Sequence, residues 1–166
     1  MKSYSMLSLF FFASIVASMV AFMVAFVVAG PVSASEVGSV KSLEGQAWII
    51  RGEEQIPAKA GLGIMADDIL KTDDGGAMGI ILRDDTIISM GPSSHMILAE
   101  FVFQPGEKRF SMLTKFLKGT FTYVSGVMAK LDPESVKVET PVGMVAIRGT
   151  HFLLKVEDQF LLTVDE

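Results

Sequence analysis

Short alternating runs separated by Pro and Gly breaks fill residues 135–152, and they constrain the fold more than any other feature of the sequence. Val136 and Val138 fall on one face of an extended chain, whereas Lys137 and Glu139 fall on the other, which is the two-residue period of a half-buried strand. After a Thr-Pro-Val-Gly break the alternation restarts twice, at Val145 and Ile147 and then at Phe152, Leu154 and Val156. The segment therefore predicts three short strands.

Turn signals recur at close intervals through the rest of the chain. Between them lie runs rich in the residue types enriched in strands, at positions 46–50, 78–82, 86–90, 96–103 and 119–124. This spacing predicts an all-β domain. We expect residues 110–118 to form a further strand, and we leave residues 127–131 open as a single helical turn.

Evenly spaced short strands suit two architectures, a β-sandwich and a β-helix-like solenoid of stacked coils. The breaks shift the phase of the alternation, which favours a chain that bends through coils over long flat hairpins. We therefore predict an all-β fold, a short β-helix-like solenoid, with the β-sandwich as the alternative.

Residues 7–30 carry no charge, and Val32 and Ala34 fit the small-residue rule of a signal-peptidase site. We expect an exported protein whose residues 1–34 are a signal peptide, which places it in the periplasm or elsewhere outside the cytoplasm. The apolar run also reaches the length of about 20 residues that spans a bilayer. An uncleaved hydrophobic helix that anchors the chain is therefore the alternative, with membrane contact confined to residues 7–30.

Residues 35–166 have the size of one domain. They hold all 19 acidic residues and all basic residues but Lys2, so 13 positive and 19 negative charges give a net charge of −6. Nucleic-acid binders depend on clustered Lys and Arg, so this composition predicts no nucleic-acid partner. The absence of cysteine excludes disulfides, thiolate zinc sites and cysteine nucleophiles.

The motifs resemble the FecR-like periplasmic domain family, which ends in a Thr-Pro-x-Gly-x-Val-x-Val-x-Gly-Thr-x-Phe signature. The matching residues here are Thr140, Pro141, Gly143, Val145, Ile147, Gly149, Thr150 and Phe152. Further likeness lies at residues 45–49, 68–72, 85–93 and 118–121, so the resemblance covers roughly residues 37–156. The resemblance implies a short β-helix-like solenoid in which the signature residues are structural.

In signalling members of the family, such a domain lies outside the inner membrane and relays the occupancy of an outer-membrane transporter to a sigma factor. This sequence shows neither the cytoplasmic segment that would contact a sigma factor nor the further domain that would meet the transporter. We therefore do not extend iron-uptake or sigma-factor signalling to it. The resemblance implies a non-enzymatic protein-binding or signalling module of the cell envelope, whose partner is an envelope protein or a cell-wall component.

Two other functions remain open from the residues. The first is a structural scaffold or oligomerising element of the envelope. The second is an enzyme acting on cell-wall polymer, which the sequence disfavours because it offers no set of acid, base and nucleophile.

Several residue types invite a more specific interpretation. Asp doublets at 67–68, 73–74 and 84–85 could supply oxygen ligands to calcium, but each falls at a turn, where Asp bonds the nearby backbone, so we interpret them as turn residues. His95 and His151 have no metal-ligand spacing and read as ordinary strand positions. We expect neither a metal nor a cofactor.

Three further expectations concern which residues are buried and which lie at the surface. We expect Trp48, the sole tryptophan, to be buried. We expect the basic residues between positions 108 and 118 to be solvated while the neighbouring phenylalanines fill the core; they are Lys108, Arg109, Lys115 and Lys118. We expect the carboxyl-terminal strand, residues 152–164, to leave an edge that a partner strand can use.

Overall fold

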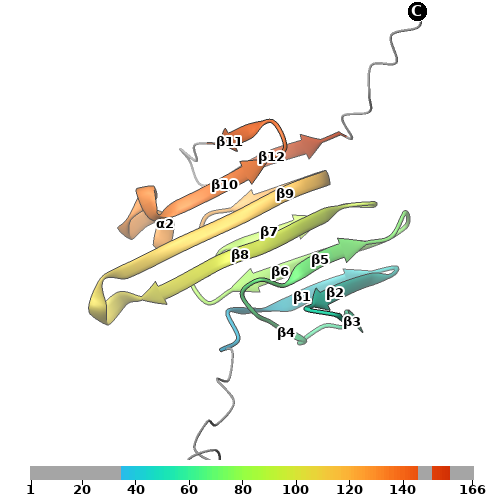
Figure 1. Cartoon of the computed structure of the whole chain (residues 1–166), viewed down its shortest axis with the longest axis horizontal. Coiled ribbons are helices and arrows are strands. Elements are labelled where there is room, and N and C mark those ends of the chain that lie inside the picture. Colours follow the sequence, from blue (N-terminus) through green and yellow to red (C-terminus); the bar gives the residue numbers. More distant parts are fainter. Residues whose placement is uncertain (1–34, 146–150, 158–166) are drawn as a thin grey trace, which may run out of the picture. The chain divides into compact units, whose positions relative to one another are not determined.

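A computed structural model describes residues 35–145 and 151–157, which belong to one compact unit that begins at Ala34. They form a twelve-stranded sheet (Figure 1). Its strands are β1 (Gly38–Glu44), β2 (Ala47–Arg51), β3 (Glu54–Pro57), β4 (Gly63–Ile64), β5 (Ile69–Thr72), β6 (Ala77–Leu82), β7 (Ile87–Met90), β8 (His95–Gln104), β9 (Arg109–Val124), β10 (Val136–Thr140), β11 (Gly143–Val145) and β12 (His151–Val156). One short helix, α2 (Met128–Leu131), and the 3-10 turns η1 (Pro105–Glu107) and η2 (Pro133–Ser135) complete these elements.

The prediction of an all-β domain is confirmed. All five β-rich runs lie in strands apart from Gln46 and Thr86, the first residues of two of them; residues 110–118 belong to β9, and the open segment 127–131 contains α2.

Four long antiparallel segments make up the centre of the sheet, and three of them are interrupted by a bend. β1 continues into β2, β5 into β6 and β7 into β8, while β9 is a single strand. The pairing of β1 with β6 ends at Glu44 opposite Ala77, and the pairing of β2 with β5 resumes at Ala47 opposite Thr72. β7 and β8 likewise pair with successive parts of β9. Each short sequence run is therefore half of a longer bent strand.

The bends lie at one level across the sheet, and we call this line the corner: residues 45–46, 73–76, 91–94 and 118–120. Buried hydroxyl groups join its strands. The Thr72 hydroxyl donates to the Gly91 carbonyl at 2.7 Å and accepts from the Ser94 N–H at 2.9 Å. The Thr120 N–H donates to the Ser94 hydroxyl at 3.1 Å. These hydrogen bonds connect backbone groups of neighbouring segments where the bend interrupts the sheet ladder.

Gly119 shows why the corner needs glycine. Its φ is +107°, a region that side chains rarely adopt. A Cβ atom at this position would lie 2.5 Å from the Ser94 Cα, which is backbone and cannot rotate away. Close approach of β9 to the turn before β8 therefore depends on the missing side chain.

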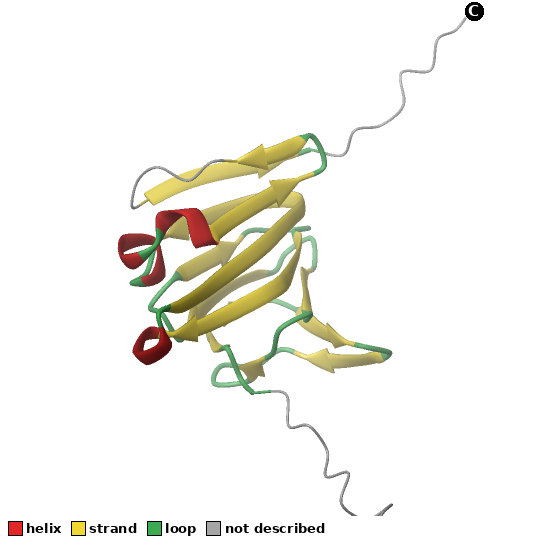
Figure 2. Cartoon of the chain, turned by 60° about the vertical axis from the view of Figure 1, so that its left-hand side comes forward, coloured by secondary structure: helices red, strands yellow, loops and turns green. Residues whose placement is uncertain are grey.

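The solenoid prediction is wrong. Stacked coils would pair their strands in parallel, whereas among the described pairings only β9 with β10 is parallel. The prediction failed because a bend within a long strand shifts the alternation phase just as the corner of a solenoid coil does. The β-sandwich alternative is closer, but the two halves of the sheet are continuous through β9, and the sheet curls as one piece (Figure 2).

The inward faces of both halves form one core cluster. Its largest fully buried side chains include Tyr123, Phe116 and Phe121, and the Phe116 and Phe121 rings stack with centroids 4.3 Å apart across the corner. β9 thus supplies core residues to both halves. This agrees with the expectation that phenylalanines beside the basic residues fill the core.

Two sets of predictions fall outside the described residues. They are the leader, residues 1–34, and three signature positions, Ile147, Gly149 and Thr150. Over residues 35–145 and 151–157, the chain has no helix with the length and apolar character needed to cross a membrane.

Candidate binding surface

β9 has different partners on one flank along its length. β10 pairs with it as far as Lys115, opposite Glu139, and β12 pairs with it from Gly119, opposite Val156. Between these points the two flanking strands part at the corner. We call the surface at this parting the fork, residues 140–145 and 154–157 (upper part of Figure 1).

A cavity of about 470 Å³ opens at the fork. The residues that line it are Thr140, Pro141, Val142, Val145, Leu154, Lys155, Val156 and Glu157. Its floor is mostly apolar, and the two charged side chains come from the end of β12. Three of the signature residues are in this lining, so the signature builds one wall of the cavity.

The Thr-Pro-x-Gly part of the signature makes the tight hairpin between β10 and β11. The Thr140 hydroxyl donates to the Gly143 carbonyl at 2.9 Å, and these residues face each other as the last pair of the hairpin. Gly143 has a φ of +145°, which favours glycine. Val138 is fully buried while Lys137 is exposed, which confirms the predicted alternation of β10.

Phe152, the last signature residue, anchors β12 to the sheet. Its ring stacks on Tyr123 with centroids 4.9 Å apart and planes at 15°. Burial raises the pKa of Tyr123 to about 12, partly offset by its hydrogen bond with Thr86. Phe152, Leu154 and Val156 face inward, as predicted.

Large apolar side chains are exposed around the fork. Val142 is 73% exposed, Met144 66% and Leu153 69%. In the part of the chain that the structure describes, β11 pairs only with β10 and β12 only with β9. Unpaired backbone groups therefore lie beside exposed apolar side chains, which is a combination that partner strands use. The predicted carboxyl-terminal edge begins at β12, and residues 158–164 of that prediction lie outside the described residues.

Two ion pairs flank the fork. Lys115 and Glu139 are 2.9 Å apart, and Lys155 and Glu157 are 2.7 Å apart. All four side chains are at least one-third exposed, so solvent screens both pairs. They give the rim of the fork both signs of charge and add little to stability.

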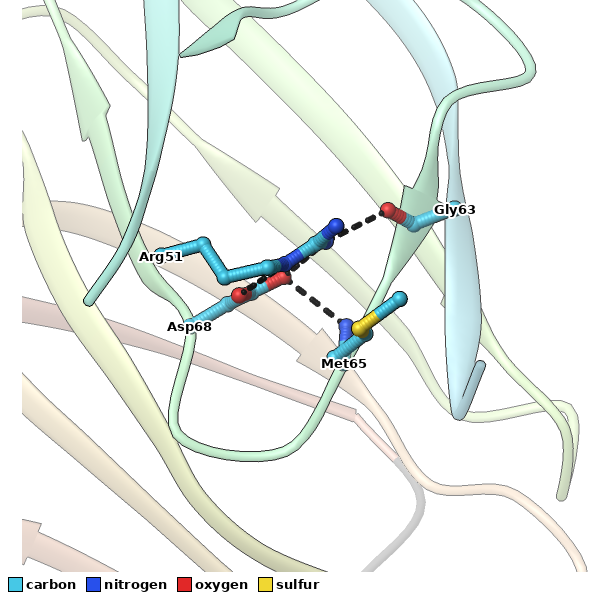
Figure 3. Close-up of polar contacts among 4 residues, drawn as sticks. All are labelled: Arg51, Gly63, Met65 and Asp68. Carbon is cyan, nitrogen blue, oxygen red and sulfur yellow. Dashed lines mark hydrogen bonds and ion pairs between the residues drawn. The ribbon is translucent and has the colours of Figure 1, made fainter. Parts of the chain in front are cut away.

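Asp68 makes a buried ion pair that the sequence did not reveal (Figure 3). Arg51, at the end of β2, donates from Nε to Asp68 Oδ1 at 2.8 Å and from Nη2 to Asp68 Oδ2 at 2.7 Å. The same Nη2 also donates to the Gly63 carbonyl at 3.0 Å. Asp68 also accepts from the Met65 N–H at 2.8 Å. The pair closes the loop between β4 and β5. Nothing in the local pattern links residues 17 positions apart, so only the fold brings them together.

Asp84 is buried by a different arrangement. It accepts from the Thr86 hydroxyl at 2.8 Å and from the Met128 N–H at 3.4 Å, while the Thr86 hydroxyl accepts from the Gly126 N–H at 3.1 Å. This network ties the turn between β6 and β7 to α2. Asp67 and Asp85 have φ of 65°, as turn residues do, but their partners in each doublet are core acceptors.

The remaining candidates are the two histidines and the basic residues between positions 108 and 118. His95 and His151 are the first residues of β8 and β12, as expected of strand positions. Lys108 and Arg109 are exposed, whereas Lys115 and Lys118 are half-buried. Over the described ranges, no group of three or more His, Asp or Glu residues is placed to hold a metal ion.

The prediction for Trp48 needs correction. Ala47 and Ile49 point into the core, so Trp48 lies on the outer face of β2 and is only half-buried. The prediction rested on the size and hydrophobicity of tryptophan and did not assign Trp48 to a face of the strand.

Comparison with known proteins identifies the family of this chain. Residues 68–165 match the family described as FecR protein. The chain belongs to the FecR family. The match begins at the buried Asp68 and includes the corner residues from position 73 onward and the whole fork. FecR proteins are regulatory and signalling proteins associated with the cell envelope. No curated protein and no solved structure matches the chain significantly.

Proposed function

We propose that this FecR protein is an exported, non-enzymatic module of the cell envelope that binds a partner protein at the fork. The observation that carries this is the exposure of Val142, Met144 and Leu153 beside the unpaired edges of β11 and β12. An extended segment of another envelope protein fits this surface. Its backbone would pair with β12, and an apolar side chain would enter the cavity.

The rest of the domain supports a binding role for the fork. Its core is closed around β9, and the corner is fixed by buried hydrogen bonds, so the scaffold holds the two edges in place before a partner arrives. A preorganised edge loses little conformational freedom on binding. The uncharged run 7–30 and the small residues before position 35 support export, with cleavage after Ala34 as the proposed maturation step.

Site-specific photo-crosslinking in the native envelope tests the proposed function. A photoreactive residue at Leu153 is expected to form one discrete adduct with a partner protein. The matched control is Leu131 on α2, which is 57% exposed and lies beyond the opposite end of β10. Adducts of equal yield and pattern from both positions would contradict a specific surface at the fork.

Solution size separates this function from the scaffold alternative, which the same unpaired edges favour. A binding module is expected to stay monomeric as its concentration rises, whereas a scaffold would self-associate through β12. Light scattering on residues 35–166 distinguishes the two, and intact mass of the exported protein tests cleavage after Ala34.

A further inference from the structure

A row of three side chains crosses the outer face of the sheet on β2, β5 and β8. In the sheet register Trp48 of β2 lies opposite Lys71 of β5, and Lys71 lies opposite His95 of β8. Directly opposite residues share a face of the sheet. The residues on either side of each point inward and are buried, among them Ile49, Leu70 and Met96. An aromatic ring, an ammonium group and an imidazole therefore stand side by side on the surface.

The charge of this row is opposite to that of the whole chain. The chain carries 19 acidic and 14 basic residues. The row continues to Pro57 on β3, and no Asp or Glu occupies any of its four positions. A local positive surface on an acidic protein favours an anionic ligand over a cationic one.

His95 has an unused hydrogen-bonding atom. Its Nε2 is buried and has no partner. Burial lowers the pKa of His95, and the nearby Lys71 lowers it further. In the register His95 lies between Lys71 and Lys118; Lys118 already takes part in another interaction, and Lys71 is the cation that lowers the pKa of the imidazole. An anion bound to Lys71 would offset this unfavourable charge at the imidazole.

A cavity of about 310 Å³ borders Trp48, at the end of the row away from His95. Its lining does not include Lys71 or His95 and consists of Leu43, Gly45, Gln46, Ala47, Trp48, Pro57 and Ala58. β2, β5 and β8, which carry Trp48, Lys71 and His95, each have a paired strand on both sides, so a peptide could add to the sheet only at the neighbouring edge strand β3. A ligand over these three residues must be recognised by their side chains. A flat indole face beside cations suits a sugar ring with a pendant carboxylate, because the ring stacks on the indole while the carboxylate meets the cations.

We propose that this outer face binds a carboxylated glycan, with Trp48 stacking on a sugar ring and Lys71 and His95 binding its carboxylate. The site is separate from the fork. The glycan proposal does not depend on the protein partner proposed for the fork.

Intrinsic fluorescence tests the proposal directly, because Trp48 is the only tryptophan. Residues 35–166 are titrated with a galacturonic acid hexamer and with its methyl ester, which keeps the sugar rings but lacks the charge. A saturable change in Trp48 emission is expected with the acid, and binding about tenfold weaker or more with the ester. Equal binding of acid and ester would overturn the proposal.

Variants assign the carboxylate contacts. Lys71→Gln is expected to weaken binding of the acid about tenfold while the unfolding midpoint is unchanged. Lys137→Gln is the matched control, since Lys137 is exposed on β10 of the same sheet but outside the row. Binding is expected to be tighter near about pH 5.5 than about pH 7.5, because the anion favours protonated His95, and His95→Gln should remove that difference. Unchanged affinity in Lys71→Gln would refute the assignment.

Two other anionic polymers complete the experiment. Polyglutamate and oligothymidylate carry the charge of an acidic peptide and of a single-stranded nucleic acid. Both are expected to bind more weakly than the galacturonate hexamer at the same salt concentration. If either binds as tightly, the site is a general anion or nucleic-acid surface and the glycan proposal is wrong.

Discussion

At the corner and at the fork the chain uses the same two residue types, threonine and glycine, in opposite surroundings. Gly119 and Gly143 both have positive φ, at +107° and +145°. A Cβ atom on Gly119 would collide with the backbone of Ser94, whereas a Cβ atom on Gly143 would meet nothing within 4 Å. The first glycine allows two segments to touch, and the second only shapes a turn at the surface. A glycine with positive φ therefore allows close packing at the corner, whereas at the fork it shapes an exposed turn.

The largest expected effect comes from substituting the two glycines. Gly119→Ala combines backbone strain with collision and is expected to cost about 4 kcal/mol of unfolding free energy, whereas Gly143→Ala costs about 1–2 kcal/mol from strain alone. Chemical denaturation of residues 35–166 measures both. Equal losses would mean that the corner tolerates a side chain and that the two regions do not differ in this way.

Ion pairs sharpen the same contrast. Asp68 is 1% exposed, so Arg51→Met leaves a buried carboxylate without its cation and is expected to cost about 2–3 kcal/mol, reduced because Arg51 itself is 30% exposed. The matched variant at the fork is Lys155→Met. It breaks an exposed pair with Glu157 and should leave the unfolding midpoint unchanged within error. A large loss of stability in Lys155→Met would show that the two ion pairs do not differ in this way.

The exposed apolar residues of the fork should matter for binding and hardly for stability. Replacing Val142, Met144 and Leu153 together by serine is expected to change unfolding free energy by less than about 1 kcal/mol. The same variant should lose the adduct formed from a photoreactive residue placed at Val145. Leu131→Ser serves as the control and should keep the adduct. Retained crosslinking in the triple variant would argue against apolar docking at this surface.

The smallest effect is spectroscopic and reports the contact between β12 and the body. Tyr123 is the only tyrosine in residues 35–166, so ultraviolet absorbance follows its ionisation alone. Its folded pKa of about 12 lies above the ordinary value of 10, so this group contributes stability below pH 10 that is lost as pH rises through 12. Phe152→Ala should expose the phenol and shift its titration toward 10. An unchanged titration would show that β12 does not shield it.

Local periodicity was sufficient for the strands and insufficient for their arrangement. The alternation of Val136 and Val138 with Lys137 is a property of neighbouring residues, and it correctly assigned the faces of β10. The corner depends on Thr72, Ser94 and Thr120, which lie far apart in the sequence and meet only when the bent strands align. A single sequence shows each break but not that the breaks lie at one level.

The candidate site shows the same limit. The Thr-Pro-x-Gly turn and the edge at β12 followed from residue types with known backbone preferences. The cavity at the fork and the Arg51–Asp68 pair required knowledge of which segments flank β9 and which loops meet. Trp48 was assigned to the core because its own hydrophobicity was weighed without the register of β2.

The alignment of the bends restricts how members of this fold can change in length. Side chains alternate faces with every residue, so one deletion between β5 and β6 would turn the inward set of one half outward while leaving the other half unchanged. Three neighbouring segments would need matching deletions at the same level to restore the match. Length variation is therefore expected to gather at the hairpin tips, such as Gly52 and Gly106, and to spare the line where the sheet folds.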